Sequence, residues 1–270
     1  MQFLHPEHDE PRELSLDDVF LCPRYFDGRS RLDVDLTPDD FPGGAHPVVS
    51  ANMNAVTGKR MAETMARYGG LGVLPQDMAL ETVERIVQHI HGAHTRFDTP
   101  LAVTAEASLR DVQGIIYKRS HGMVVVVDDA HRPLGIISHS DLRDRDQYTP
   151  AARLMSTHLV SLRDDVSNRE AFLRMDDERV KAAPVVDGRG GLVGILTKSD
   201  AVRMELLAPS VDGEGRLMVA AAVGISKEAG RRANALLELG VNAIVIDTAH
   251  GHQRRMQEAI ADVRRAVGPD

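Results

Sequence analysis

Residues 243–247 read Ala243-Ile244-Val245-Ile246-Asp247, four apolar residues closed by a carboxylate. Short apolar runs bounded by turn residues are typical of strands buried in a parallel sheet. The next amphipathic segment, from about residue 252 to 267, has the spacing of a helix. The stretch is therefore predicted to be a βα unit, with Asp247 at the carboxyl end of its strand.

Three more units of this kind are predicted. Apolar strands are expected at residues 47–50, where the strand is short and buried, at 71–74 and at 217–223. Helices are expected from 59 to 68, 80 to 90 and 226 to 239. Short strands that alternate with amphipathic helices imply a parallel sheet. Such units build either a (β/α)8 barrel or a doubly wound sheet, and no G-x-G-x-x-G follows the first strand to favour the latter.

The three helices carry further expectations. In the first, Met61, Met65 and Tyr68 fall on one face, and Gly69-Gly70 ends the helix. In the third, Ser226 is the expected N-cap and Gly240 follows the helix. The second has a single apolar stripe, formed by Val83, Ile86, Val87 and Ile90.

Between these flanks the chain repeats itself. Gly135-Ile136-Ile137-Ser138-His139-Ser140-Asp141 is matched 59 residues later by Gly194-Ile195-Leu196-Thr197-Lys198-Ser199-Asp200, and Ser108 and Ser167 share that offset. Each copy is predicted to fold as helix, strand, turn, strand and helix, with the serine at the start of its first helix. Neither copy buries both of its faces alone, so the two are expected to pair.

This repeat resembles a tandem of cystathionine-β-synthase (CBS) motifs, an α+β module that commonly binds adenine or guanine nucleotides. The resemblance implies that four residues meet the ribose and phosphate of ATP or GTP: Ser138, Asp141, Thr197 and Asp200. Hydroxyls donate to phosphate, and carboxylates accept from ribose hydroxyls. The same four residues are also good helix caps, and the two roles are compatible.

Composition excludes several classes of protein. The net charge is −8, which disfavours nucleic-acid partners. No apolar run approaches the ~18 residues of a membrane span, and the N-terminus lacks the features of a signal peptide. A cytoplasmic protein is expected. The single cysteine, Cys22, excludes a multi-thiolate metal site and is predicted to be a packed structural thiol.

The flanks resemble the IMP dehydrogenase/GMP reductase family. The segments that carry the resemblance are Leu14–Leu21, Val49–Thr57, Gly69–Val73, Ala220–Gly224 and Ile246–His252. The CBS pair lies at that family's usual insertion point. The resemblance implies a (β/α)8 TIM barrel in residues 1–96 and 208–270, of which four βα units are present. It implies an inserted tandem CBS domain at 97–207.

The family's site residues transfer to two segments. Ala51, Asn52 and Met53 are implied to contact the purine mononucleotide, with Met53 against the base. Asp247, Thr248 and His250 are implied to contact the nicotinamide cofactor. Asp247 could instead be a helix N-cap, and Met53 a core methionine. A metal at His250 and His252 is not expected, because no third ligand has suitable spacing.

The family's usual Asp at position 54 is Asn54 here, which removes a charge and puts a carboxylate role at that position in doubt. The family's catalytic cysteine lies on a later loop that has no match in this chain, so the catalytic residues are unknown. Outside the insert about 160 residues remain, fewer than the ~250 of a typical barrel. The sequence is therefore interpreted as the N-terminal portion of a longer enzyme.

Two chemistries share this scaffold. Ala51-Asn52-Met53 matches GMP reductases, which convert GMP to IMP with NADPH. Leu74–Met78 replaces the His-containing segment that is typical of dehydrogenases. Asp247–His252 matches IMP dehydrogenases, which oxidise IMP with NAD. The mixture resembles the actinobacterial dehydrogenase-related subgroup assigned to GMP reduction, so the reductase is favoured. The family also implies a homotetramer or octamer, and a monovalent cation bound by the later part of the barrel. The alternative from another class is a non-catalytic nucleotide sensor.

Overall fold

The computed structural model describes residues 17, 19–20, 22–25, 27–38 and 43–268. The chain divides into two units, Met1–Asp35 and Leu36–Asp270. In the first, a short 3-10 helix, η3 (Arg31–Asp33), is the only described element. Cys22 is exposed. The prediction of a packed thiol was therefore wrong, because a packed side chain would be shielded from solvent.

The second unit contains a four-stranded parallel sheet. Its strands are β1 (Val49–Ser50), β2 (Leu71–Leu74), β9 (Ala220–Val223) and β10 (Ala243–Ile246), in the order β1-β2-β9-β10. The strands of the two flanks are thus hydrogen-bonded into one sheet, as predicted. Among the described residues β1 and β10 form the two edges of this sheet.

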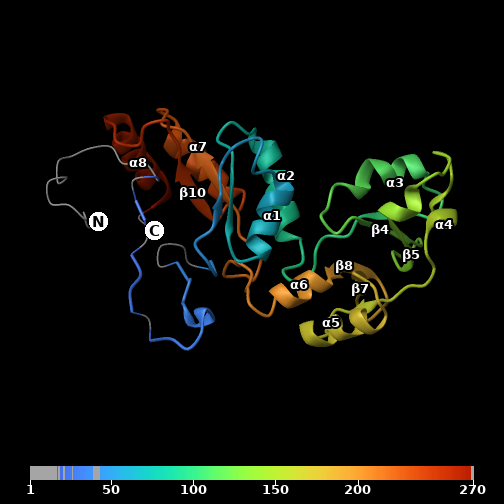
Figure 1. Ribbon diagram of the computed structural model, residues 1–270. Helices are drawn as coiled ribbons and strands as arrows, with labels where there is room; N and C mark the ends of the chain where they lie inside the picture. Colours follow the sequence, from blue (N-terminus) through green and yellow to red (C-terminus); the bar gives the residue numbers. More distant parts are fainter. Residues whose placement is uncertain (1–16, 18, 21, 26, 39–42, 269–270) are drawn as a thin grey trace. The chain divides into compact units, whose positions relative to one another are not determined.

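Helices pack on one face of the sheet (Figure 1): α1 (Lys59–Arg67), α2 (Leu80–His91), α7 (Ala229–Glu238) and α8 (Arg254–Val267). Alternate residues of β9 point to opposite faces, because side chains alternate along a strand. Ala221 and Val223 pack under the helices, whereas Ala220 and Ala222 join a smaller apolar cluster on the other face. Helices on one face and an apolar cluster on the other are what one arc of a βα barrel requires.

The intervening repeat folds into two three-stranded sheets of matching topology. The first contains β3 (Ala102–Thr104), β4 (Met123–Val127) and β5 (Pro133–Ser138), and the second β6 (Leu162–Arg163), β7 (Ala182–Val186) and β8 (Leu192–Thr197). The first strand of each sheet, β3 or β6, runs parallel to its neighbour and was not predicted. The other elements of the repeat are α3 (Leu109–Ile116), η4 (His139–Leu142), α4 (Ala151–Leu154), α5 (Asn168–Asp177) and α6 (Lys198–Arg203).

The 59-residue offset extends to strand register. Met123 pairs with Ser138 in the first copy, and Ala182 pairs with Thr197 in the second. The copies also pack together, as predicted, through a shared cluster of buried residues: Val125, Val127, Ala182, Leu192 and Ile195.

The predicted caps and turns hold in both copies of the repeat. Ser108 and Ser167 accept hydrogen bonds from backbone N–H groups in the first turns of α3 and α5, so both are confirmed as N-caps. At the hairpin turns, Asp128 and Asp187 each accept two such bonds from the loop that follows.

Three local expectations were wrong. The strand at 47–50 is not buried: Val49 is 55% exposed, because β1 is an edge strand. In α1 the predicted face does not form the core, and Met61 is 41% exposed. Ser226 does not cap α7, which begins at Ala229 after a turn and has Glu228 as its N-cap. The stripe on α2 was predicted correctly, and all four of its members are buried. Within the described residues, no helix is long and apolar enough to cross a membrane.

Candidate functional site

The loops that follow the four parallel strands meet at one edge of the sheet. Asn52 follows β1, Gln76 follows β2, Gly224 follows β9 and Asp247 follows β10. A Cβ added to Gly224 would lie 2.5 Å from Gln76 Oε1, so those two loops are in close contact. In parallel α/β proteins, the carboxyl ends of the strands are where ligands bind.

A side-chain hydrogen bond joins the first and last of these loops. Asn52 Nδ2 donates to Asp247 Oδ2 at 2.8 Å, and both side chains are partly buried. Their strands, β1 and β10, are separated by two others, and neighbouring strands lie about 4.8 Å apart. The bond therefore requires the strand ends to curve toward one another, as they do in a barrel arc. It fixes the Asp247 carboxylate, whose Oδ1 forms no hydrogen bond within the described residues.

The loop after β1 is held at its base and exposed at its tip. Thr57 is fully buried, and its Oγ1 lies 2.6 Å from the carbonyl oxygen of Ala51 and 2.9 Å from Ser50 Oγ. Ala51 is exposed, and Met53 is 58% exposed. Met53 is therefore not a core methionine. Its side chain is accessible for contact with a flat apolar group.

Asn54 contacts the next loop. Its Nδ2 donates to Asp77 Oδ2 at 2.9 Å, which links the loops after β1 and β2. A carboxylate at position 54 would face Asp77 with like charge. The sequence did not predict this contact between the two loops.

The segment after β10 forms a compact turn. The Gln253 side chain donates to the carbonyl oxygen of His250 at 2.7 Å and approaches Thr248 Oγ1 at 3.2 Å. The N-cap of α8 is Gln253, so the alternative that Asp247 caps this helix was wrong. His250 is exposed, and no group of three or more His, Cys, Asp or Glu side chains gathers for a metal among the described residues.

A separate cavity of 810 Å³ lies between the two copies of the repeat. All four residues predicted to contact a nucleotide line it: Ser138, Asp141, Thr197 and Asp200. Its volume is within the range of pockets that hold small ligands. Basic side chains line it as well, among them Lys181 and Arg203, which were not predicted. They stand at positions that differ between the copies, so the repeat pattern could not identify them.

The same four residues also make the local contacts of helix caps. Ser138 N and Oγ each lie 2.7 Å from Asp141 Oδ2, and Thr197 Oγ1 donates to Asp200 Oδ2 at 2.6 Å. Asp200 N–H in turn donates to Thr197 Oγ1 at 3.0 Å. Capping and the lining of the cavity therefore coexist in these side chains.

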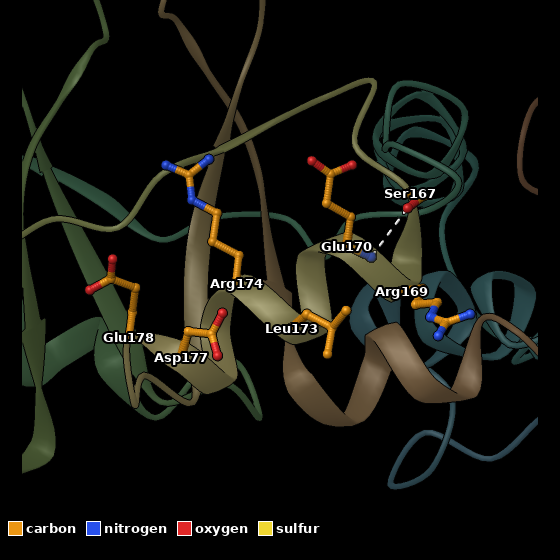
Figure 2. Close-up of a pocket in the computed structure, with 7 residues that line it drawn as sticks. All are labelled: Ser167, Arg169, Glu170, Leu173, Arg174, Asp177 and Glu178. Atoms are coloured by element: carbon orange, nitrogen blue, oxygen red, sulfur yellow. Dashed lines mark hydrogen bonds between the residues drawn. The ribbon is translucent and has the colours of Figure 1, made fainter.

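A shallower hollow of 410 Å³ lies on the outer surface of α5 (Figure 2). Its charged side chains splay outward from a single helix, and the one hydrogen bond drawn there is the cap between Ser167 and the backbone of Glu170. Side chains that diverge do not enclose a ligand, so this surface is not a candidate site.

Comparison with known proteins places this fold and these loops in one family. Residues 13–269 match the IMP dehydrogenase / GMP reductase domain. The chain therefore belongs to the IMP dehydrogenase/GMP reductase family, whose members are oxidoreductases of purine nucleotides that use nicotinamide cofactors.

Two curated relatives come from Mycobacterium tuberculosis. Its GMP reductase is 38% identical over 97% of this chain, and its inosine-5'-monophosphate dehydrogenase is 34% identical over 82%. The chain spans 54% of the former and 43% of the latter, about half the length of these relatives.

Solved structures of Trypanosoma brucei GMP reductase are similar to this fold. The structure in complex with guanosine 5'-monophosphate has a TM-score of 0.58 and 29% sequence identity. That match covers 96% of this chain and 56% of the reductase chain. The structure in complex with guanosine 5'-triphosphate has a TM-score of 0.59 and 30% sequence identity. That match covers 96% of this chain and 64% of the reductase chain.

Proposed function

We propose that the polypeptide carrying this chain is a GMP reductase, which converts GMP to IMP with NADPH as the reductant. The single observation that carries the proposal is the hydrogen bond between Asn52 and Asp247. It unites the end of β1 with the end of β10 in a family whose relatives include GMP reductases. The loop 51–53 forms the purine wall of the site, and Asp247, Thr248 and His250 form the cofactor wall.

The residues present suit these roles. Asp247 keeps one carboxylate oxygen available, and a carboxylate is a good acceptor for the hydroxyls of a nicotinamide ribose. Met53 is exposed at the tip of an anchored loop, where its polarizable side chain can pack on a purine ring. A bound NADPH would supply the hydride that replaces the amino group at C2 of the purine, and the amino group would take up a proton and leave as ammonia. Asn52 and Asp247 hold the two walls in register, because transfer requires reacting atoms within about 3–3.5 Å.

The cavity of the repeat serves regulation in this proposal. Residues 97–207 act as a tandem CBS module inserted in the barrel residues 1–96 and 208–270. ATP or GTP binds the module in the cavity that Ser138, Asp141, Thr197 and Asp200 line. The support is that all four line one cavity of suitable volume together with basic side chains. The barrel closes with further βα units, and the whole enzyme assembles as a homotetramer or octamer in the cytoplasm.

A second candidate is IMP dehydrogenase, the NAD-dependent oxidation of IMP to XMP. The specific observation in its favour is the segment Asp247–His252, together with the 34% identity to the mycobacterial dehydrogenase. The segment Ala51-Asn52-Met53 and the 38% identity to the mycobacterial GMP reductase favour the reductase.

Absorbance at 340 nm distinguishes the candidates. The full polypeptide that contains residues 1–270 is mixed with GMP and NADPH, and in parallel with IMP and NAD. We expect NADPH absorbance to fall only when GMP is present, with ammonia and IMP formed in equal amounts. NADH formation from IMP and NAD without GMP-dependent NADPH oxidation would establish the dehydrogenase instead. Nucleotide binding without turnover in either assay would leave a sensor without catalysis.

A further inference from the structure

The two copies of the repeat do not offer equivalent carboxylates to the cavity. Asp141 and Asp200 occupy matching positions, 59 residues apart, and both line the cavity. In the first copy, Ser138 approaches only Oδ2 of Asp141, and Oδ1 forms no hydrogen bond within the part of the chain that the structure describes. Asp141 can therefore accept hydrogen bonds from a ligand.

Asp200 is already committed on both oxygens. Its Oδ2 accepts from Thr197 Oγ1 at 2.6 Å. Its Oδ1 accepts from the phenol of Tyr68 at 2.7 Å and from Arg203 Nη1 at 3.2 Å. A carboxylate oxygen has two lone pairs, so two donors saturate Oδ1. The side chain of Asp200 is only 16% exposed.

Tyr68 comes from outside the repeat. It is the C-cap residue of α1, the helix that follows the loop carrying Met53. Burial, followed by the hydrogen bond and charge of Asp200, raises the pKa of Tyr68 to about 12. The phenol therefore stays protonated and donates at physiological pH. A ligand that used Oδ1 of Asp200 would have to displace this donor or Arg203.

The basic side chains are asymmetric in the opposite sense. Lys181 and Arg203 line the cavity from the second copy, and the matching positions in the first copy are Gly122 and Asp144. Phosphate groups are therefore favoured beside Lys181 and Arg203. The available carboxylate of Asp141 and these two cations come from different copies of the repeat.

We infer that the cavity takes one nucleotide, with its ribose on Asp141 and its phosphates toward Lys181 and Arg203, and that Asp200 instead ties the repeat to α1 through Tyr68. This assignment rests on the proposed regulatory function. It adds the number of bound nucleotides, their orientation, and a contact between the repeat and α1.

Isothermal titration calorimetry of the full polypeptide with ATP, and separately with GTP, tests the ligand. We expect one nucleotide per chain. Asp141→Asn should weaken binding roughly tenfold or more, because a charged acceptor is lost. The matched variants Asp200→Asn and Tyr68→Phe should bind within about threefold of the wild type. Two nucleotides per wild-type chain, or a larger loss from Asp200→Asn than from Asp141→Asn, would overturn the assignment while leaving nucleotide sensing intact.

A double-mutant cycle in urea unfolding tests the tie to α1. If Tyr68 and Asp200 act as one contact, the double variant should have a free energy of unfolding no lower than that of the less stable single variant. Fully additive losses would contradict it. Failure of the wild type to bind either nucleotide would refute both the proposed regulatory site and this assignment of its ligand.

Discussion

At the scale of single residues, the Glu63 carboxylate is held by four side chains. Its side chain is completely buried. One oxygen lies 2.6 Å from Arg67 Nη2 and 2.7 Å from Thr99 Oγ1, and the other 2.6 Å from Arg119 Nη2 and 3.0 Å from His89 Nε2. Burial alone raises the pKa of Glu63, but the hydrogen bonds from His89 and Arg119 and the charge of Arg67 outweigh it, so the pKa lies well below its ordinary value.

Replacing Glu63 with glutamine should destabilise the protein strongly. The amide presents one acceptor where two oxygens now face four donors, and it leaves Arg67 and Arg119 to share the single carboxylate of Asp98. Breaking a buried ion pair costs about 3–5 kcal/mol. Urea unfolding measures the loss, with Glu258→Gln as the control, because the pair of Glu258 with Arg254 is exposed. An equal, small change in both variants would contradict the role of Glu63.

The same carboxylate sets an acid limit on stability. The folded-state pKa of Glu63 lies below its ordinary value of 4.5, so the stabilisation is fully present above pH 4.5 and is lost as the pH falls through the folded-state pKa. The Glu63→Gln variant should therefore lose less stability than the wild type between pH 5 and the acid transition.

At the scale of elements, apolar periodicity predicted some packing and misled elsewhere. On α2, periodicity identified all four buried residues, because bulky side chains fill that interface. On α1 the buried face consists of Ala62, Ala66, Glu63 and Arg67. Two of these are small and two are charged, so a search for large apolar side chains selected the wrong face. The charges are buried only because partners from α2 and from residues 98–119 reach them.

The close approach of α1 to β2 depends on Gly72. A Cβ there would lie 2.4 Å from Ala62 Cα, a backbone atom that cannot rotate away. Gly72→Ala should therefore force the helix from the sheet and lower the free energy of unfolding by about 1–3 kcal/mol. Gly114→Ala in α3 is the matched control, because nothing lies within 4 Å of its added Cβ. Thermal unfolding compares them. The Gly114→Ala variant should unfold at the same temperature as the wild type or a higher one. An unchanged unfolding temperature for Gly72→Ala would contradict the prediction, because it would show that α1 and β2 can move apart without cost.

At the scale of the whole molecule, sequence order predicted the sheet and the end of the strand at Asp247. Strand ends can be predicted from local patterns, and the 59-residue repeat placed four residues that do line one cavity. The contacts that connect distant parts could not be predicted in this way. Asn52 and Asp247 are 195 residues apart, and Tyr68 and Asp200 are 132 apart. No periodicity encodes such pairs, because they arise from how separate elements pack.

The steady-state kinetics of Asp247→Ala in the full polypeptide test the central claim, that the ends of β1 and β10 form the two walls of one reductase site. The loss of a charged acceptor should raise the KM for NADPH roughly tenfold or more. The KM for GMP should rise clearly less than the KM for NADPH, because Asp247 reaches the purine wall only through its hydrogen bond to Asn52. An unchanged KM for NADPH, or equal increases for both substrates, would contradict the assignment of Asp247 to the cofactor.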